Sequence, residues 1–357
     1  DLDSDANSIE TSGGDVTVTV LNGTDASSDD TNESSPTLKV SDKFNTNDGN
    51  IILRVLGNNV TGGNNQDSGN IEIASGATVQ TDTSNDQGGT SVLKGNVTVV
   101  GSVFANTDES INIKAPSSDI VIDPSGVTGS GKLTLDPGAG FNVIFQSTAT
   151  AQVTEGGGQA GDLIIQNAAN VTMNSDSEII VDGSVDIGAG NAGGIVDSVT
   201  GNIQLADVTL DNNANGDGSG NAVSLGVKTT SGNINLTGAI DANADPDAMG
   251  LDHDVSLTAG GAITNNSGAT TALEKVDSLT LDAGAQIGSS AKPITINSKT
   301  VTASTTGANV IEIDNTPNVL NLDAGSDTVT LNGLTNGGSA NITYKQDGKD
   351  LLVDSAI

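Results

Sequence analysis

Short runs of alternating apolar and polar residues recur along the chain. Each run places Val, Ile or Leu at every second position, and many follow a Gly-Asn or Gly-Asp pair. Period-2 alternation between turn residues is typical of β-strands with one buried face, so the pattern predicts an all-β protein. The clearest runs begin at Gly14 (GDVTVTV), Gly49 (GNIILRV), Gly69 (GNIEI), Gly95 (GNVTVV), Gly131 (GKLTL), Gly161 (GDLII), Gly201 (GNIQL) and Gly232 (GNINL).

One stretch of the chain repeats after 31 residues, from Gly201 to Gly232. Residues 201–225 and 232–257 both read as strand, turn, strand, acidic loop and strand. The second copy has one extra residue, which we place in its loop, so that Leu225 aligns with Leu257. A helical pattern is confined to residues 270–276 (TTALEKV), which allow two turns at most.

Two architectures fit short strands spaced about 10 to 20 residues apart. Sandwiches and barrels have cores of large, often aromatic side chains, and a sandwich would stop near about 100–150 residues. Here the pattern persists over most of the chain, the apolar residues are medium-sized, and Asn and Gly recur at the expected corners. At corners we expect left-handed backbone and side-chain ladders. We therefore predict a β-solenoid, and about 22 residues per coil gives about 16 coils and a rod of about 75–80 Å.

Three segments are expected along this rod. Residues 1–48 are more polar and less regular, which indicates a cap or atypical first turns, because end coils must protect their edges. Residues 49–317 carry the solenoid repeats, and residues 318–357 form closing strands or continue the solenoid. The first ten residues lack the basic and apolar regions of a signal peptide, which suits a processed chain or a piece of a longer one.

The charge of the chain excludes several classes of partner. There are 45 Asp and Glu against 12 Lys and Arg, a net charge of −33, which opposes nucleic-acid binding. Five aromatic residues are too few for base or sugar stacking, and the absence of Cys excludes thiolate metal sites. No apolar run approaches about 20 residues, so membrane insertion is not expected. Such acidity also predicts that copies pack together only where cations screen the charge.

Two strings, VSLTAGGAITNNSGA from Val255 and LTLDAGAQIGSSAKPITINSKTVTAS from Leu279, resemble filamentous haemagglutinin-type repeats, as do the GNI-x-L units. These repeats occur in large bacterial surface exoproteins and adhesins. The resemblance is clearest over residues 161–303. It implies a right-handed parallel β-helix, export to the cell surface, and a role in adhesion or in a filament or coat. It brings no catalytic residues with it.

Two acidic loops have the oxygen spacing that opens an EF-hand calcium loop, D-x-[DN]-x-[DN]-G. The first loop departs from that motif at position twelve, where Ala222 replaces the bidentate Glu, whereas the second has Asp252 there. The alternative is a pair of solvated turns in a chain rich in Asp, Asn and Gly. The candidate ligands for calcium (Ca2+) are Asp211, Asn213, Asn215, Asp217, Asp241, Asn243, Asp245, Asp247 and Asp252.

Candidate catalytic residues are few. The one His, His253, stands between two Asp residues, and we expect it in a surface loop without a catalytic partner. Phe141 and Phe145 are expected to form one stacked rung of the core. Polysaccharide lyases need clustered cations, and hydrolases need paired carboxylates and usually aromatic platforms, none of which the sequence marks.

These observations predict a non-enzymatic, extracellular structural or adhesive solenoid at a bacterial cell surface. Its expected partners are neighbouring copies of itself and host or surface glycans. Two alternatives remain open. One is a carbohydrate-active β-helix enzyme, such as a lyase or a tailspike-like hydrolase. The other is a surface-layer or sheath subunit.

Overall fold

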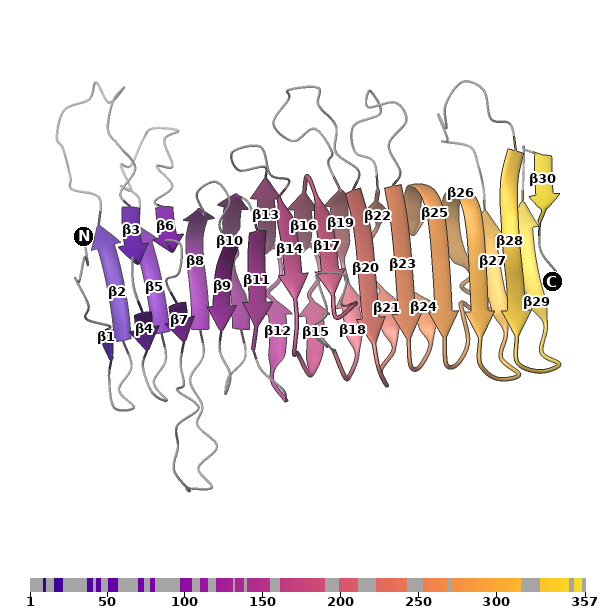
Figure 1. Cartoon of the computed structure of the whole chain (residues 1–357), viewed down its shortest axis with the longest axis horizontal. Helices are drawn as coiled ribbons and strands as arrows, with labels where there is room; N and C mark the ends of the chain where they lie inside the picture. Colours follow the sequence, from indigo (N-terminus) through magenta and orange to yellow (C-terminus); the bar gives the residue numbers. More distant parts are fainter. Residues whose placement is uncertain are drawn as a thin grey trace.

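The chain forms a parallel β-helix in its computed structural model (Figure 1). The described residues contain thirty strands and no helix, so the predicted all-β fold is confirmed. The strand pairings are parallel throughout. The hand of the coil stays a prediction of the resemblance. The structure describes residues 9–10, 16–21, 37–40, 43–45, 51–56, 70–73, 78–80, 97–104, 110–114, 120–130, 132–137, 140–154, 161–189, 199–210, 223–242, 253–268, 271–315, 328–346 and 350–354.

The strands stack into three faces, named A, B and C here. Three strands run from face A round to face B: β8, β10 and β27, whose later residues pair with β26. Face A consists of β2 (Val16–Leu21), β5 (Ile51–Leu56), β8 (Val97–Phe104), β10 (Ile120–Ser130), β12 (Asn142–Phe145), β15 (Asn170–Met173), β18 (Ile203–Leu205), β21 (Ile234–Leu236), β24 (Ile263–Asn265), β27 (Ile311–Asn315) and β29 (Ile342–Gln346).

Faces B and C share two long strands that bend round a corner, β25 and β26. Face B contains the second halves of β8 and β10 and the first parts of β25 (Leu273–Ala283) and β26 (Ile294–Thr305). Its other strands are β3 (Thr37–Val40), β6 (Asn70–Ile73), β13 (Thr150–Thr154), β16 (Glu178–Val181), β19 (Asp207–Leu210) and β22 (Ile240–Asp241). Face C contains the second halves of β25 and β26. Its other strands are β1 (Ile9–Glu10), β4 (Lys43–Asn45), β7 (Thr78–Gln80), β9 (Ser110–Lys114), β11 (Lys132–Asp136), β14 (Asp162–Ile165), β17 (Ser184–Ile187), β20 (Val223–Thr229), β23 (His253–Ala259), β28 (Thr328–Asn336) and β30 (Asp350–Val353).

Face A gives the number of coils. Register partners lead from Val16 to Ile342 in eleven steps. These 326 residues correspond to about 30 residues per coil, and eleven steps of about 4.8 Å give about 53 Å. The expected coil of about 22 residues, and with it the count of about 16 coils, is therefore wrong. The reason is that the connections between strands differ in length and some are long. One step takes 23 residues, from Ile120 to Val143, and another takes 46, from Ile51 to Val97.

Columns of apolar side chains fill the interior, because inward and outward positions alternate along each strand. Among the described residues, Phe145 is the largest fully buried side chain, and it lies between Ile122 and Met173 of the adjacent coils. Phe141 precedes β12 and is only half-buried. The predicted rung of two Phe side chains is thus right for Phe145 and wrong for Phe141, because Phe141 lies before the strand, where its inward and outward alternation does not apply.

Asparagine side chains join successive coils at one corner of the rod. Asn170 donates from Nδ2 to Oδ1 of Asn142 at 2.9 Å. The Oδ1 atom of Asn170 accepts from the backbone N–H of Asn202 at 2.8 Å, and that of Asn202 accepts from Asn233 at 2.9 Å. The last step runs from the N–H of Ala262 to Asn233 at 2.7 Å. These bonds satisfy backbone donors that the strand ladder leaves unpaired at the turn. The predicted Asn ladder is confirmed.

Glycine is needed at the same corner for close approach of two coils. A Cβ atom on Gly232 would lie well within 3.0 Å of the backbone of Gly201, and one on Gly284 would meet Gly260 in the same way. None of these four glycines has a positive φ. The left-handed backbone expected at corners is therefore wrong at these glycines, where missing side-chain volume is the reason for glycine. It is confirmed at other turns, where φ is 54° for Asn167, 69° for Gly188 and 65° for Gly288.

The predicted 31-residue repeat is confirmed at its first strand, where Ile203 pairs with Ile234. At the third strand, Leu225 pairs with Val255 and not with the predicted Leu257. A shift of two residues keeps the same side chains on the inner face, so the apolar pattern could not distinguish the two alignments.

The strands of both terminal segments continue the same ladder. Figure 1 shows β1 and β2 at one end of the rod and β29 and β30 at the other. In the described residues, β2 pairs with β5 and β27 pairs with β29, so parallel pairing crosses both predicted segment limits. The division into 1–48, 49–317 and 318–357 stays a prediction.

Candidate functional site

The candidate site is the outer surface of face B beside the two acidic loops. Residues 211–222 follow β19, and residues 243–252 come just after β22. The inward residues Val208 and Ile240 are fully buried register partners. They fix β19 and β22 side by side, and the next outward pair is Thr209 with Asp241. The strands that precede the two loops therefore end side by side on adjacent coils.

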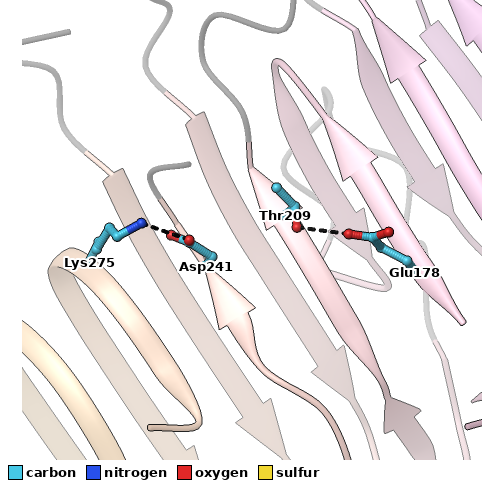
Figure 2. A network of polar contacts seen from close by, with 4 residues as sticks. All are labelled: Glu178, Thr209, Asp241 and Lys275. Carbon is cyan, nitrogen blue, oxygen red and sulfur yellow. Dashed lines mark hydrogen bonds and ion pairs between the residues drawn. The ribbon is translucent and has the colours of Figure 1, made fainter. Parts of the chain in front are cut away.

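Two polar contacts involve four side chains from four successive coils of this face (Figure 2). Thr209 donates from its hydroxyl to Oε1 of Glu178 at 3.1 Å. Lys275 donates from Nζ to Oδ2 of Asp241 at 2.8 Å, and both side chains are 28% exposed. Because water screens a partly exposed ion pair, this contact contributes at most about 1 kcal/mol.

Lys275 reaches Asp241 because the backbone of β25 is irregular at that point. Its φ is 55°, in the left-handed region, and the pairing of β25 with β26 shifts between Leu273 and Val276. A bulge of this kind turns a side chain away from the regular alternation. No residue type marks this bulge, since residues 270–276 contain no Gly and carry a helical pattern.

The structure describes only one of the nine calcium candidates, Asp241. The other eight lie outside the described residues: Asp211, Asn213, Asn215, Asp217, Asn243, Asp245, Asp247 and Asp252. Asp241 pairs with Thr209, so it is not the positional equivalent of Asp211. Asp211 and Asp241 are 30 residues apart, whereas β18 and β21 pair residues 31 apart and β19 and β22 pair residues 32 apart. The step from 31 to 32 comes from an extra residue in the turn before β22, where Leu236 and Ile240 are four apart while Leu205 and Val208 are three apart.

Asp241 already has a cation partner in Lys275. A calcium ion at this carboxylate would have to displace the ammonium group. Within the described part of the chain, no three His or acidic side chains gather closely enough to hold a metal ion. The calcium site therefore stays a prediction that depends on the two loops.

His253 does not lie in a surface loop, and that expectation was wrong. It begins β23, pairs with Val223 and is 3% exposed. Its backbone N–H donates to Oδ2 of Asp277 at 3.2 Å. Alternation backward from Val255 and Leu257 would have predicted this inward position, but the two flanking Asp residues obscured it. A buried imidazole is not positioned to act on a ligand outside the rod.

The outer surface of face C is rich in hydroxyl groups. Ser224 donates to the hydroxyl of Ser184 at 3.0 Å, and Ser304 donates to Oδ1 of Asp282 at 2.7 Å. A shallow depression of about 330 Å³ crosses β20, β23 and β25. Its lining includes one carboxylate, that of Asp254, together with serine and threonine hydroxyls. Such a surface offers hydrogen bonds to a polar ligand, whereas glycoside hydrolysis takes two carboxylates.

No protein family model, curated protein or solved structure matches this chain. Among the described residues, there is no helix with the length and apolar character needed to cross a membrane. The parallel strand ladder alone thus defines the class of this protein, which is a parallel β-solenoid.

Proposed function

We propose that this chain is a non-enzymatic structural or adhesive rod at the outer surface of a bacterial cell. The observation that carries the proposal is the parallel ladder that runs from Val16 to Ile342. In such a solenoid each coil contacts only its neighbours, and the stacked backbone hydrogen bonds make a stiff, extended spacer. Stiffness and reach are the properties that a surface filament, coat or adhesin needs.

The outer surfaces of the rod support this role. Face C presents rows of hydroxyl groups, which suit weak, repeated hydrogen bonds to glycans or to neighbouring molecules. The net charge of −33 keeps separate rods apart at low salt. The partners of the rod are thus glycans and other copies of itself, approached where cations screen the charge.

Imaging and an activity assay test this proposal together. We expect negative-stain electron microscopy to reveal straight rods whose coils extend for about 53 Å per molecule. We also expect no new reducing ends or unsaturated sugars when the protein is incubated with a panel of anionic polysaccharides. Compact particles would contradict the rod, and released sugar products would favour the enzyme instead.

Calcium bound at the acidic loops is part of the same proposal. We expect calcium to raise the Tm by several degrees, because an ion at about 100 times its Kd stabilises the folded state by about 2.7 kcal/mol. Lys275→Gln should enlarge this shift, since the ammonium group no longer competes for Asp241. Asp241→Asn should reduce it. Thermal unfolding with calcium, with magnesium and with a chelator provides the measurement.

The pair between Lys345 and Asp314 offers a matched control for this experiment. It has a similar distance, 3.0 Å, on coils near the C-terminal end of the rod. Lys345→Gln removes one positive charge, as Lys275→Gln does, and should leave the calcium shift unchanged. An equal change in both variants would show a general effect of net charge. No calcium shift in the unaltered protein would contradict calcium binding.

A further inference from the structure

The C-terminal end of the rod exposes residues that belong to the core columns. The large apolar side chains exposed in the described residues all lie in β30, where Leu351 is 42%, Leu352 50% and Val353 47% exposed. Leu351 pairs with Val329 and Val353 pairs with Leu331, and these two partners are 1% exposed. Leu351 and Val353 therefore occupy inward positions for which no further described coil provides cover.

Face A is incomplete in the same way at both ends. Val16 and Val18 of β2, and Ile342 and Tyr344 of β29, pack on the core but are only half-buried. Successive register partners connect Val16 to Ile342, so the two residues are the first and last members of one column. In the described residues, β2 and β29 each have a strand partner on one side. An open strand edge of this kind is a template for another strand.

Face C shows how one end fits the other. β30 pairs with Thr328–Leu331 of β28, so the later part of β28, around Leu334, has its described partner only in β26. Register partners followed along face C place Ile9 of β1 in the row of Leu334. If a second molecule continues the rod in register, its β1 falls beside Leu334, past the end of β30. Its β2 then falls on β29.

We propose that the rods assemble head to tail, with the N-terminal coil of a second copy covering the C-terminal end of the first. In this junction β2 of the second copy pairs in parallel with β29, with Val16 beside Ile342 and Val18 beside Tyr344. The contact uses two different surfaces of identical molecules, so it generates an open filament and not a closed dimer. The inference rests on the proposed function, because it names the partner of the surface rod as another copy.

The occupant is a second copy because the junction repeats the interface between coils inside the chain. The same face, parallel sense, register and aliphatic columns continue from one molecule into the next. The net charge of −33 opposes the approach of two rods. Filaments should therefore form in about 1 M salt, where the Debye length is about 3 Å, and dissociate at low ionic strength.

Engineered cysteines test this register, since the chain has no Cys of its own. The junction places Thr17 of one copy beside Thr343 of the other. Neighbouring parallel strands lie about 4.8 Å apart, within the Cα separation of about 4.4–6.8 Å that a disulfide needs. We expect the double variant Thr17→Cys/Thr343→Cys to form a ladder of covalent oligomers in 1 M salt. Non-reducing gel electrophoresis gives the readout.

Three control variants make the result specific. Thr19→Cys/Thr343→Cys is out of register by two residues, with a Cα separation of about 8 Å, and should cross-link at least tenfold less. Thr17→Cys alone reports contacts between N-terminal ends, and Thr343→Cys alone reports contacts between C-terminal ends. Both single variants should stay monomeric. Dimers of either single variant, or equal cross-linking in and out of register, would overturn the proposal.

Tyr344 provides a label-free readout of the same contact, because the chain has one Tyr and no Trp. Its hydroxyl donates to Gln346 at 2.9 Å and accepts from Asn315 at 2.9 Å. Burial raises the pKa of Tyr344, against a smaller lowering by the hydrogen bond with Asn315. Filament formation should make Tyr344 emission at least twofold less sensitive to acrylamide. Monomeric rods with unchanged quenching in 1 M salt would overturn the head-to-tail junction but leave the proposed rod function intact.

Discussion

Replacing Phe145 with alanine should lower the free energy of unfolding by about 3–5 kcal/mol. The side chain is fully buried between Ile122 and Met173, so its removal leaves a cavity inside the solenoid. Strands above and below are held by their own hydrogen bonds, which prevents the coil from collapsing to fill the space. Denaturant unfolding followed by far-UV circular dichroism gives the measurement.

Ile144→Ala is the matched control for this variant. Ile144 is the preceding residue of the same strand, but it lies on the outer face and is only half-buried. The control should cost about 1 kcal/mol or less. Phe145→Leu should recover most of the loss, because it restores apolar volume to the column. Equal losses in Phe145→Ala and Ile144→Ala would mean that the two residues do not lie on opposite faces.

The loss should also be local. Each coil of a solenoid interacts mainly with its two neighbours, so a defect at Phe145 weakens the adjacent coils most. Tyr344 lies at the far C-terminal end and reports the unfolding of that end by its fluorescence. We expect Phe145→Ala to shift the circular dichroism transition more than the Tyr344 transition.

The alternation of apolar residues was sufficient to predict the strands and most of the interior. Val255 and Leu257, for example, are inward and buried as period 2 requires. A period of two fixes which face a residue belongs to but says nothing about the length of the connection to the next strand. This is why the fold class was predicted from the sequence while the number of coils was not.

The candidate site was predicted only in part, for reasons that are local. The pattern of Asp and Asn drew attention to Asp241, but the extra turn residue before β22 moved it opposite Thr209. Its partner Lys275 depends on a left-handed backbone that the sequence does not mark. His253 was misplaced because two flanking acids outweighed the alternation that points it inward. Charge and spacing were thus less reliable guides than the periodicity of the strand.

The corner glycines show where the fold tolerates no side chain at all. Gly232 is buried at a corner, and its carbonyl accepts from the N–H of Gly261 at 2.7 Å. On the other side, the position of a Cβ atom on Gly232 is already filled by the backbone of Gly201. Backbone cannot rotate out of the way as a flexible side chain can, so the two coils must separate to admit a methyl group.

Gly232→Ala should therefore destabilise the protein by about 3 kcal/mol, at the upper end of the range for overpacking. The strain falls on the corner where Asn202 and Asn233 join adjacent coils, so hydrogen exchange should increase first at those backbone amides. Gly268→Ala is the control, because a Cβ atom there meets nothing within 4 Å. It should be neutral or stabilising by up to about 1 kcal/mol, since alanine lowers the entropy of the unfolded chain. Equal stability of the two variants would mean that the coils at Gly232 do not approach as closely as backbone contact requires.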